Sequence, residues 1–403
     1  MPQAVYPLFL ALLFVAAPLR ETSATTVLWT APAILLSALM IAWAAESAQY
    51  FVAQGFALAM LAWMQTLPEF AVEAVLAWHQ QTHLLLANLT GALRLLTGLG
   101  WPAIYLTAAF SHRRATGKPL GRIVLEEHHS VEVVALMLPL LYIPVIAIKG
   151  SLTVYDGAVL IAIYAVYLWI LGKLPSEDHE TIEDLEIIPR TIVKARRPLR
   201  IFAIGMLFIA GGSLIYFSAE PFLASLLALA TLAGMPSFVF VQWIAPLVSE
   251  FPEMLSTLYW ARRSERAPMA LMNMVSSNIN QWTLLAAMLP IIYSISVGAV
   301  APITFDIKQR MELWLTLGQA VIALVFLLNM ELAWWEATSL GVLFAIPFFS
   351  AASEPFITWI YFGWAGIEVI RMFAGHRKPQ AFPLFRKVWN EHVRSGAPGD
   401  APA

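Results

Sequence analysis

Two short stretches of sequence, one in each half of the chain, decide the fold. Residues 64–70 read MQTLPEF and residues 248–254 read VSEFPEM, and each places a Pro–Glu pair in a long apolar segment. About twenty residues further on, residues 87–92 read ANLTGA and residues 272–278 read MNMVSSN. The same elements recur in the same order at a closely matching spacing, which is the pattern of an internal repeat.

The composition predicts a chain that lies in a lipid bilayer. Of its 403 residues, 60% are hydrophobic and only 12% are charged, and the mean hydropathy is +0.72. This leaves too little polar surface to cover a water-soluble globule. The formal net charge of −2 gives no reason to expect nucleic acid as a partner. The lack of cysteine excludes disulfides and thiolate metal sites.

Apolar stretches long enough to cross a membrane recur along almost the whole chain, since one span needs about 20 mostly apolar residues. The first span can also be read as a signal peptide, but residues 1–3 carry no Lys or Arg, which favours a retained helix. Roughly five spans, an odd number, separate corresponding segments, so the two copies are expected to cross the membrane in opposite directions. We predict twelve spans, at residues 5–19, 26–47, 50–79, 83–110, 131–149, 153–171, 200–233, 237–260, 268–297, 313–330, 333–350 and 355–373.

The positions of Lys and Arg in the loops predict the orientation. Cationic clusters occur at residues 112–122, 194–197, 262–266 and 371–387, and an even number of predicted spans separates each cluster from the next. All four clusters are therefore expected on one face, which should be cytoplasmic. Both termini are expected there too, in a multi-pass protein of the plasma (inner) membrane.

The repeated Pro–Glu pairs carry the chemistry. Pro68 and Pro252 each remove a backbone donor, which leaves carbonyl groups unpaired next to Glu69 and Glu253. Free carbonyls and carboxylates are ligands of hard cations. A charged group at bilayer depth costs at least ~2.5 to 3.5 kcal/mol, so an intramembrane Glu is a functional candidate. The alternative is a salt-bridged or protonated packing pair.

Further polar residues gather on the same predicted helices. Glu73 lies one turn after Glu69, and Glu250 lies three residues before Glu253. At 100° per residue, Asn273, Ser277 and Gln281 form one stripe of neutral oxygen ligands. The matching stripe of the first half, at Asn88, Ala92 and Leu96, has lost most of its oxygens. The two halves are therefore not expected to contribute equally.

These residues resemble the alpha repeats of the cation/calcium exchanger superfamily, in which a Gly-Thr-Ser-x-Pro-Glu segment precedes a Gly-Asn-x-x-Gly-Ser-Asn segment. Residues 211–253 resemble the whole start of a second repeat, with Ala219 and Glu220 opening a connection and Gly234 marking a loop. The resemblance covers most of residues 26–350. It implies an all-α polytopic membrane protein in which two inverted five-helix repeats form a ten-helix exchanger core, with one extra helix at each end.

This resemblance implies five parts of the chain. They are an extra N-terminal transmembrane segment at residues 1–25, a first repeat at 26–172, a cytoplasmic polar linker at 173–199, a second repeat at 200–350, and an extra transmembrane helix with a cytoplasmic tail at 351–403. The acid-rich segment at 173–199 is expected to be a solvated linker, with a regulatory cation site as the less favoured alternative.

The resemblance also implies the site residues. Glu69 and Glu253 correspond to the central carboxylates, which makes them the expected metal ligands. Thr66 and Ser249 belong to the Thr-Ser segments, and Ser277 is the hydroxyl of the second Gly-Ser-Asn. The predicted cation-binding set is Glu69, Glu253, Thr66, Ser249, Glu250, Ser277, Asn273, Gln281, Glu73 and Asn88.

The sequence departs from the family pattern at several of these positions. Acids or amides replace small hydroxyl residues at Gln65, Glu73 and Glu250, and Gln281 stands where an Asp is usual. Apolar residues replace the expected polar ones at Ala92, Leu93 and Leu96.

Arg94 is predicted to compensate charge, in one of two ways. We favour a structural partner of a buried acid, either Glu73 or an acid elsewhere in the bundle. The other interpretation is a built-in cation that takes the place of one transported sodium. Arg94 lies about 200° around the helix from Ala92, so it is not expected to point along the ligand stripe.

The expected function is secondary cation antiport, most simply sodium/calcium exchange by alternating access. A sodium/proton or calcium/proton exchanger on the same scaffold and a degenerate, non-transporting homologue are the alternatives. An enzyme is not expected, because His128 and His129 beside Glu126 and Glu127 lack the spacing of metal ligands on a helix. No cofactor is expected beyond the transported Ca²⁺, Na⁺ or H⁺. The expected partners are the lipid bilayer and these inorganic cations, and the sequence sets no oligomeric state.

Overall fold

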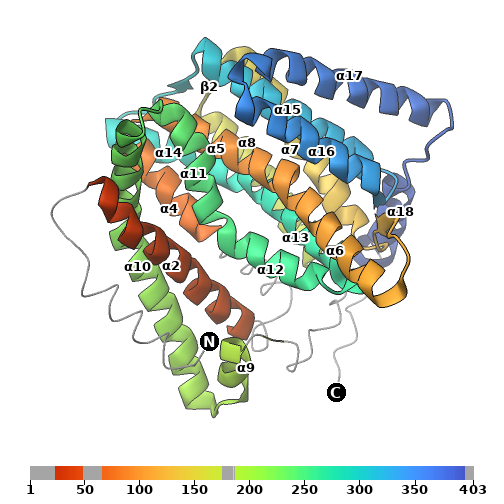
Figure 1. Ribbon diagram of the computed structural model, residues 1–403, viewed down its shortest axis with the longest axis horizontal. Helices are drawn as coiled ribbons and strands as arrows, with labels where there is room; N and C mark the ends of the chain where they lie inside the picture. Colours follow the sequence, from red (N-terminus) through yellow and green to blue (C-terminus); the bar gives the residue numbers. More distant parts are fainter. Residues whose placement is uncertain (1–22, 49–65, 175–184, 186, 395–403) are drawn as a thin grey trace.

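The computed structural model describes residues 23–48, 66–174, 185 and 187–394, and these residues form a helical bundle (Figure 1). The first half contains α2 (Val27–Ala48), α4 (Leu67–Trp78), α5 (Thr82–Leu95), the π-helical η2 (Leu96–Gly100), α6 (Trp101–Thr116), α7 (Ser130–Lys149) and α8 (Val154–Leu171). The second half contains α10 (Arg197–Leu232), α11 (Ser237–Ser249), α12 (Phe251–Ala261), α13 (Ala267–Asn280), the π-helical η4 (Gln281–Leu285), α14 (Ala286–Val297), α15 (Ile307–Leu327) and α16 (Trp334–Phe349). Helix α17 (Glu354–Phe373), helix α18 (Ala381–Val388) and the π-helical η6 (Trp389–Arg394) follow.

Eight helical segments of the described chain are long and apolar enough to cross a membrane, and α11 and α16 are shorter apolar helices. Of the twelve predicted spans, the one at 5–19 lies outside the described residues, and the one at 50–79 is described only from residue 66. The span predicted at 237–260 is wrong as a continuous helix, because the chain breaks at Glu250 between α11 and α12. The pairs α5–α6 and α13–α14 each run through a π-helical segment as one long segment.

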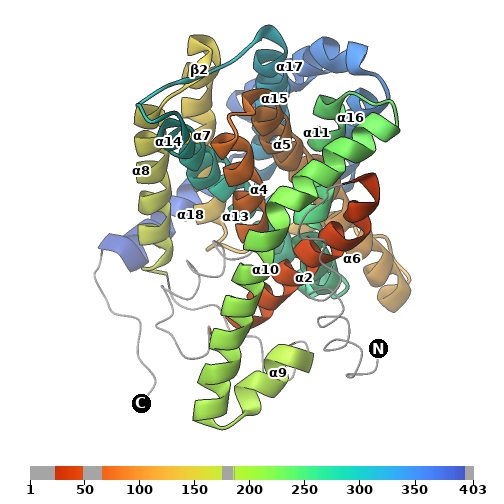
Figure 2. The ribbon, with the colours of Figure 1, turned by 90° about the vertical axis from the view of Figure 1, so that its left-hand side faces the viewer.

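The connection into the second repeat differs in part from the prediction. Ala219 and Glu220 do not open a connection, because they lie inside the 36-residue helix α10. Gly234 does mark the loop before α11, where its φ of +65° is a conformation that favours glycine. The predicted linker contains the short helix α9 (Ile187–Lys194), which packs against α2 and α10, with Ile188 against a cluster that includes Leu36 and Leu214. Figure 2 shows α2 and α10 side by side, with α9 at their lower end.

Two small antiparallel sheets tie one half of the chain to the other. Strand β1 (Arg122–Val124), before α7, pairs with β4 (Glu331–Ala333), after α15. Strand β2 (Ser151–Leu152), after α7, pairs with β3 (Ile303–Thr304), before α15. Exchanging the two halves therefore converts one sheet into the other.

Corresponding helices α4 and α12 end in different surroundings. Helix α4 ends at Trp78, whose carbonyl accepts a hydrogen bond from Ser296 near the β2–β3 sheet. Helix α12 leads instead to the loop of Glu265. Hydrogen bonds from its own backbone and from Ser264 hold the pKa of the Glu265 carboxyl below its usual range, and nearby His112 and Arg263 add to this. Two of the cationic clusters therefore lie together at the end of α12.

A close approach of two helices depends on Gly91 of α5. A Cβ atom at this position would lie 1.9 Å from the backbone oxygen of Gln242 in α11, far inside any permitted contact. We expect Gly91→Ala to destabilise the protein by about 1 to 3 kcal/mol, because α5 and α11 must move apart. Gly205→Ala in α10 is the matched control, since nothing lies within 4 Å of its added Cβ. Unfolding in detergent should separate the two variants, and equal stability would show that α11 is not held against α5.

Candidate cation-binding site

The two repeated glutamates lie in the first turns of helices that begin inside the bundle. Glu69 is in the first turn of α4 and Glu253 in the first turn of α12. Each helix has one Pro within its first two positions. The missing backbone N–H costs nothing there, because the first N–H groups of a helix have no partner within the helix. Pro252 therefore begins a new helix, and the predicted span at 237–260 is divided in front of it. Carboxylates at these positions also face the positive end of a helix dipole.

Gln281 connects the carboxylates of the two halves. Its side-chain nitrogen donates to Glu69 Oε2 at 2.9 Å and to Glu250 Oε1 at 2.6 Å. All three side chains are buried. Gln281 is also the first residue of the π-helical η4, and π-helical turns often occur at functional sites.

Glu253 is the second centre of the site. Its Oε1 accepts a hydrogen bond from the Ser277 hydroxyl and one of 3.2 Å from Asn273. The carboxyl groups of Glu250 and Glu253 are also in hydrogen-bonding contact with each other. Two ionised carboxylates can only accept hydrogen bonds, so a pair this close favours the binding of one proton. The order Glu69, Gln281, Glu250, Glu253 therefore forms one continuous buried chain of polar contacts.

Two of the predicted hydroxyl ligands behave differently from each other. Thr66 lies at the edge of the site, where its hydroxyl accepts a 2.6 Å hydrogen bond from Asn280. Ser249 donates to the carbonyls of Ala245 and Pro246 in its own helix. Thr66 is therefore linked to the other half of the chain, whereas the Ser249 hydroxyl bonds within its own helix. Asn280 is a site residue that the stripe pattern did not identify.

Glu73 and Asn88 form a separate buried pair. Asn88 donates to Glu73 Oε1 at 3.0 Å, and both side chains are fully buried. In the second half the corresponding Asn273 donates instead to the central Glu253. In the first half the amide of Asn88 therefore supports Glu73 and not Glu69, and Gln281 from the second half donates to Glu69 instead.

Several buried oxygens of the site have no hydrogen-bond donor among the described residues: Glu69 Oε1, Glu253 Oε2, Asn280 Oδ1 and Gln281 Oε1. Such oxygens suit a hard cation. Within the described chain, no group of three acidic or histidine side chains could hold a metal ion. A cation bound here would therefore also need the amide and hydroxyl oxygens around the carboxylates.

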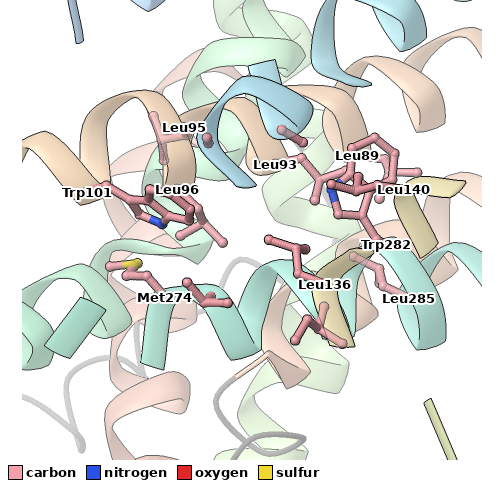
Figure 3. Close-up of a cluster of buried hydrophobic side chains, with 14 of the residues drawn as sticks. Leu89, Leu93, Leu95, Leu96, Trp101, Leu136, Leu140, Met274, Trp282 and Leu285 are labelled. Carbon is pink, nitrogen blue, oxygen red and sulfur yellow. The ribbon is translucent and has the colours of Figure 1, made fainter. Parts of the chain in front are cut away.

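Apolar side chains take the place of ligands in the first half. Leu93 and Leu96 are buried in the main hydrophobic cluster, and Figure 3 shows Leu96 beside Trp101. Leu96 starts η2 as Gln281 starts η4, so a leucine stands where the second half has its bridging amide. The site is consequently asymmetric, as the sequence predicted.

Arg94 pairs with an acid that the sequence did not single out. Its Nη2 lies 2.9 Å from Glu312 Oε2, and both side chains are buried. Glu73, one of the partners expected for Arg94, is bonded to Asn88 instead. The expected alternative, an acid elsewhere in the bundle, describes the position of Glu312 on α15.

Comparisons with known proteins agree with this architecture. The family model for the sodium/calcium exchanger protein matches residues 23–173 and 204–349. A crystal structure of the H⁺/Ca²⁺ exchanger CAX is similar over 96% of each chain, with 31% identity and a TM-score of 0.86. A search of curated protein sequences found no significant match.

Two more distant structures share the fold. The sodium-calcium exchanger NCX_Mj is 18% identical with a TM-score of 0.53, and the match covers 81% of this chain and 98% of that one. Native YfkE is 13% identical with a TM-score of 0.60, over 88% and 97% of the two chains. The predicted all-α exchanger fold and the predicted absence of enzyme chemistry are confirmed by this family assignment. The chain is a multi-pass membrane antiporter and belongs to the sodium/calcium exchanger protein family.

Proposed function

We propose that this protein exchanges calcium for protons, with Glu69, Glu250 and Glu253 alternately holding the cation and the proton. The observation that carries the proposal is the hydrogen-bonding contact between the Glu250 and Glu253 carboxyl groups. This contact favours the binding of one proton, and a divalent cation that uses both carboxylates must displace it. The similarity to an H⁺/Ca²⁺ exchanger at 31% identity supports the same coupling.

Calcium fits the oxygens around these carboxylates. Ca²⁺ takes 6 to 8 oxygen ligands in flexible geometry, including carboxylate and amide oxygens. The proposed ligands are the carboxylates of Glu69, Glu250 and Glu253, the amide oxygen of Gln281 and the hydroxyl of Ser277, with Asn273 supporting Glu253. Because the three carboxylates do not form a metal-binding group as they lie here, they must move closer together to share one ion. Gln281 now offers its nitrogen to Glu69 and Glu250. Cation binding would turn its amide so that the oxygen faces the carboxylates.

Sodium coupling, the simplest expectation from the sequence, has less support. Apolar Ala92 and Leu96 occupy first-half positions of the ligand stripe and are fully buried in the core. The neutral oxygens that would hold additional monovalent ions are therefore missing there. Glu250, in contrast, adds a titratable group in place of a small hydroxyl. Both changes favour proton coupling over sodium coupling.

Imposed gradients in proteoliposomes test the proposal. We expect an outwardly directed proton gradient to drive uptake of radioactive calcium, while a sodium gradient at equal pH drives none. An ionophore that collapses the pH difference should abolish the uptake. Uptake driven by a sodium gradient alone would show that sodium, and not the proton, is the coupling ion. No uptake under either gradient would favour a non-transporting homologue.

We also propose that the two halves are inverted repeats and that the cationic end of the bundle faces the cytoplasm of the plasma (inner) membrane. Single cysteines can be introduced directly, because the chain has none. Cysteines replacing His112 and Arg263 should react with an impermeant maleimide only from the cytoplasmic side, and one replacing Ala299 only from outside. Labelling of positions 112 and 263 from opposite sides would contradict this topology.

A further inference from the structure

A second buried charge cluster lies outside the central site, around Arg94. Arg94 on α5 reaches Glu312 on α15, and the Glu312 carboxyl interacts electrostatically with that of Glu354, the first residue of α17. Lys308, one turn before Glu312, interacts electrostatically with Glu354 from the exposed end of the cluster. Three helices are thus joined by two acids and two bases.

Arg94 balances the charge of Glu312 but does not satisfy its hydrogen bonds. Within the described residues, Arg94 Nε and Nη2 and both oxygens of Glu312 are buried without a hydrogen-bond partner. A guanidinium in a site built for it normally donates two parallel bonds to a carboxylate. Here the charges lie 2.9 Å apart without that alignment. Carboxylate oxygens that lack hydrogen-bond donors can instead coordinate a small spherical cation.

Two contacts hold Arg94 in position between α5 and this cluster. Its guanidinium lies 5.1 Å from the ring centroid of Trp243 in α11, a cation–π distance. Its own carbonyl accepts a 3.0 Å hydrogen bond from Gln319 of α15. Arg94 leaves the same helix that carries Asn88 and Ala92, but it serves a different group of acids. Helix α5 therefore contributes its charged side chain to this second cluster and not to the central site.

We propose that Glu312 and Glu354 form a monovalent-cation site and that Arg94 is the tethered cation that fills it permanently. The two carboxylates carry two negative charges, of which Lys308 offsets one and the Arg94 guanidinium the other. An ion that takes the place of the guanidinium therefore needs a single positive charge, as sodium and potassium have. With Arg94 in place, no mobile ion is needed at this position. The inference concerns a second site and does not depend on what the central site exchanges.

Removing the tethered charge tests this proposal through binding alone. The full-length Arg94→Met protein, in detergent, should be less stable than the wild type in choline chloride and should regain stability in sodium or potassium chloride. We expect the half-maximal salt concentration to be at least about tenfold lower than for any salt effect on the wild type. Arg94→Lys keeps the charge and should resemble the wild type. The measurement is the midpoint of thermal unfolding against salt concentration.

The double variant Arg94→Met/Glu312→Gln separates an ion site from a structural ion pair. It removes both charges, so it should be stable in choline chloride and should lose the response to sodium. Sodium bound at the central site would affect all variants equally and is therefore distinguishable. An Arg94→Met protein that ignores both ions, or a double variant that keeps the response, would overturn the proposal. So would failure of Arg94→Met and Arg94→Gln to fold in any salt while the double variant folds.

Discussion

Glu253→Gln and Glu69→Gln are each expected to reduce gradient-driven calcium uptake to background while leaving insertion and folding intact. The amide has nearly the shape of the carboxyl group but carries no charge, so a ligand charge is lost in a buried, low-dielectric site where it cannot be replaced by water. At Glu253 the substitution also removes the acid that we propose shares a proton with Glu250. Uptake should be measured at equal reconstituted amounts of each variant.

Two other acids provide the controls for this experiment. Glu265→Gln, in an exposed loop, should transport like the wild type. Glu73→Gln should give a milder defect or a shifted pH dependence, because Glu73 bonds to Asn88 and does not join the chain of central contacts. Wild-type rates in both central variants would reduce Glu69 and Glu253 to packing residues and remove the main support for the proposed function.

Arg377→Met is expected to lower the free energy of unfolding by about 3 to 5 kcal/mol, the usual cost of leaving a buried charge without its partner. Arg377 donates to Glu336 and, at 2.7 Å, to the carbonyl of Phe326. It also lies 3.3 Å from Glu368. Both acids are buried, so neither can recover its hydration in the variant. Equilibrium unfolding in mixed detergent micelles measures the loss.

Arg371→Met is the matched control, since Arg371 bonds to the same Glu368 at 2.7 Å but is half exposed. Exposed ion pairs contribute about 0 to 1 kcal/mol, so this variant should change little. Adding Glu336→Gln to Arg377→Met should restore part of the stability, because it removes one unpaired charge. Equal losses for Arg371→Met and Arg377→Met would mean that burial does not decide the strength of this network.

The sequence was sufficient to locate the central carboxylates because their signal is local and repeated. A Glu after a Pro in an apolar segment is costly wherever it stands, and its recurrence at Glu69 and Glu253 pointed to both halves at once. The i, i+4 spacing likewise placed Asn273, Ser277 and Gln281 on one side of a helix. The hydrogen bonds of all three residues to Glu253 or Glu69 agree with that stripe.

The sequence alone could not predict which residues of the other half each site residue contacts. Nothing local indicates that Gln281 bonds to Glu69, that Asn280 reaches Thr66, or that the acid beside Arg94 is Glu312. The break at Glu250 was not predicted, because a Pro inside an apolar run has the same local signature whether it bends one helix or begins another. Ser249 was given a ligand role, whereas its hydroxyl bonds back to its own helix, a competition common for Ser and Thr in helices.

The most direct test of the central claim is the movement of protons when calcium enters proteoliposomes that contain a pH indicator. With no sodium on either side, external calcium should drive protons out, so that the lumen becomes more alkaline as calcium accumulates. Glu253→Gln liposomes should show neither change. Calcium entry with an unchanged lumenal pH, or entry that requires lumenal sodium, would contradict the account, because the proton held between Glu250 and Glu253 would then not be the ion exchanged.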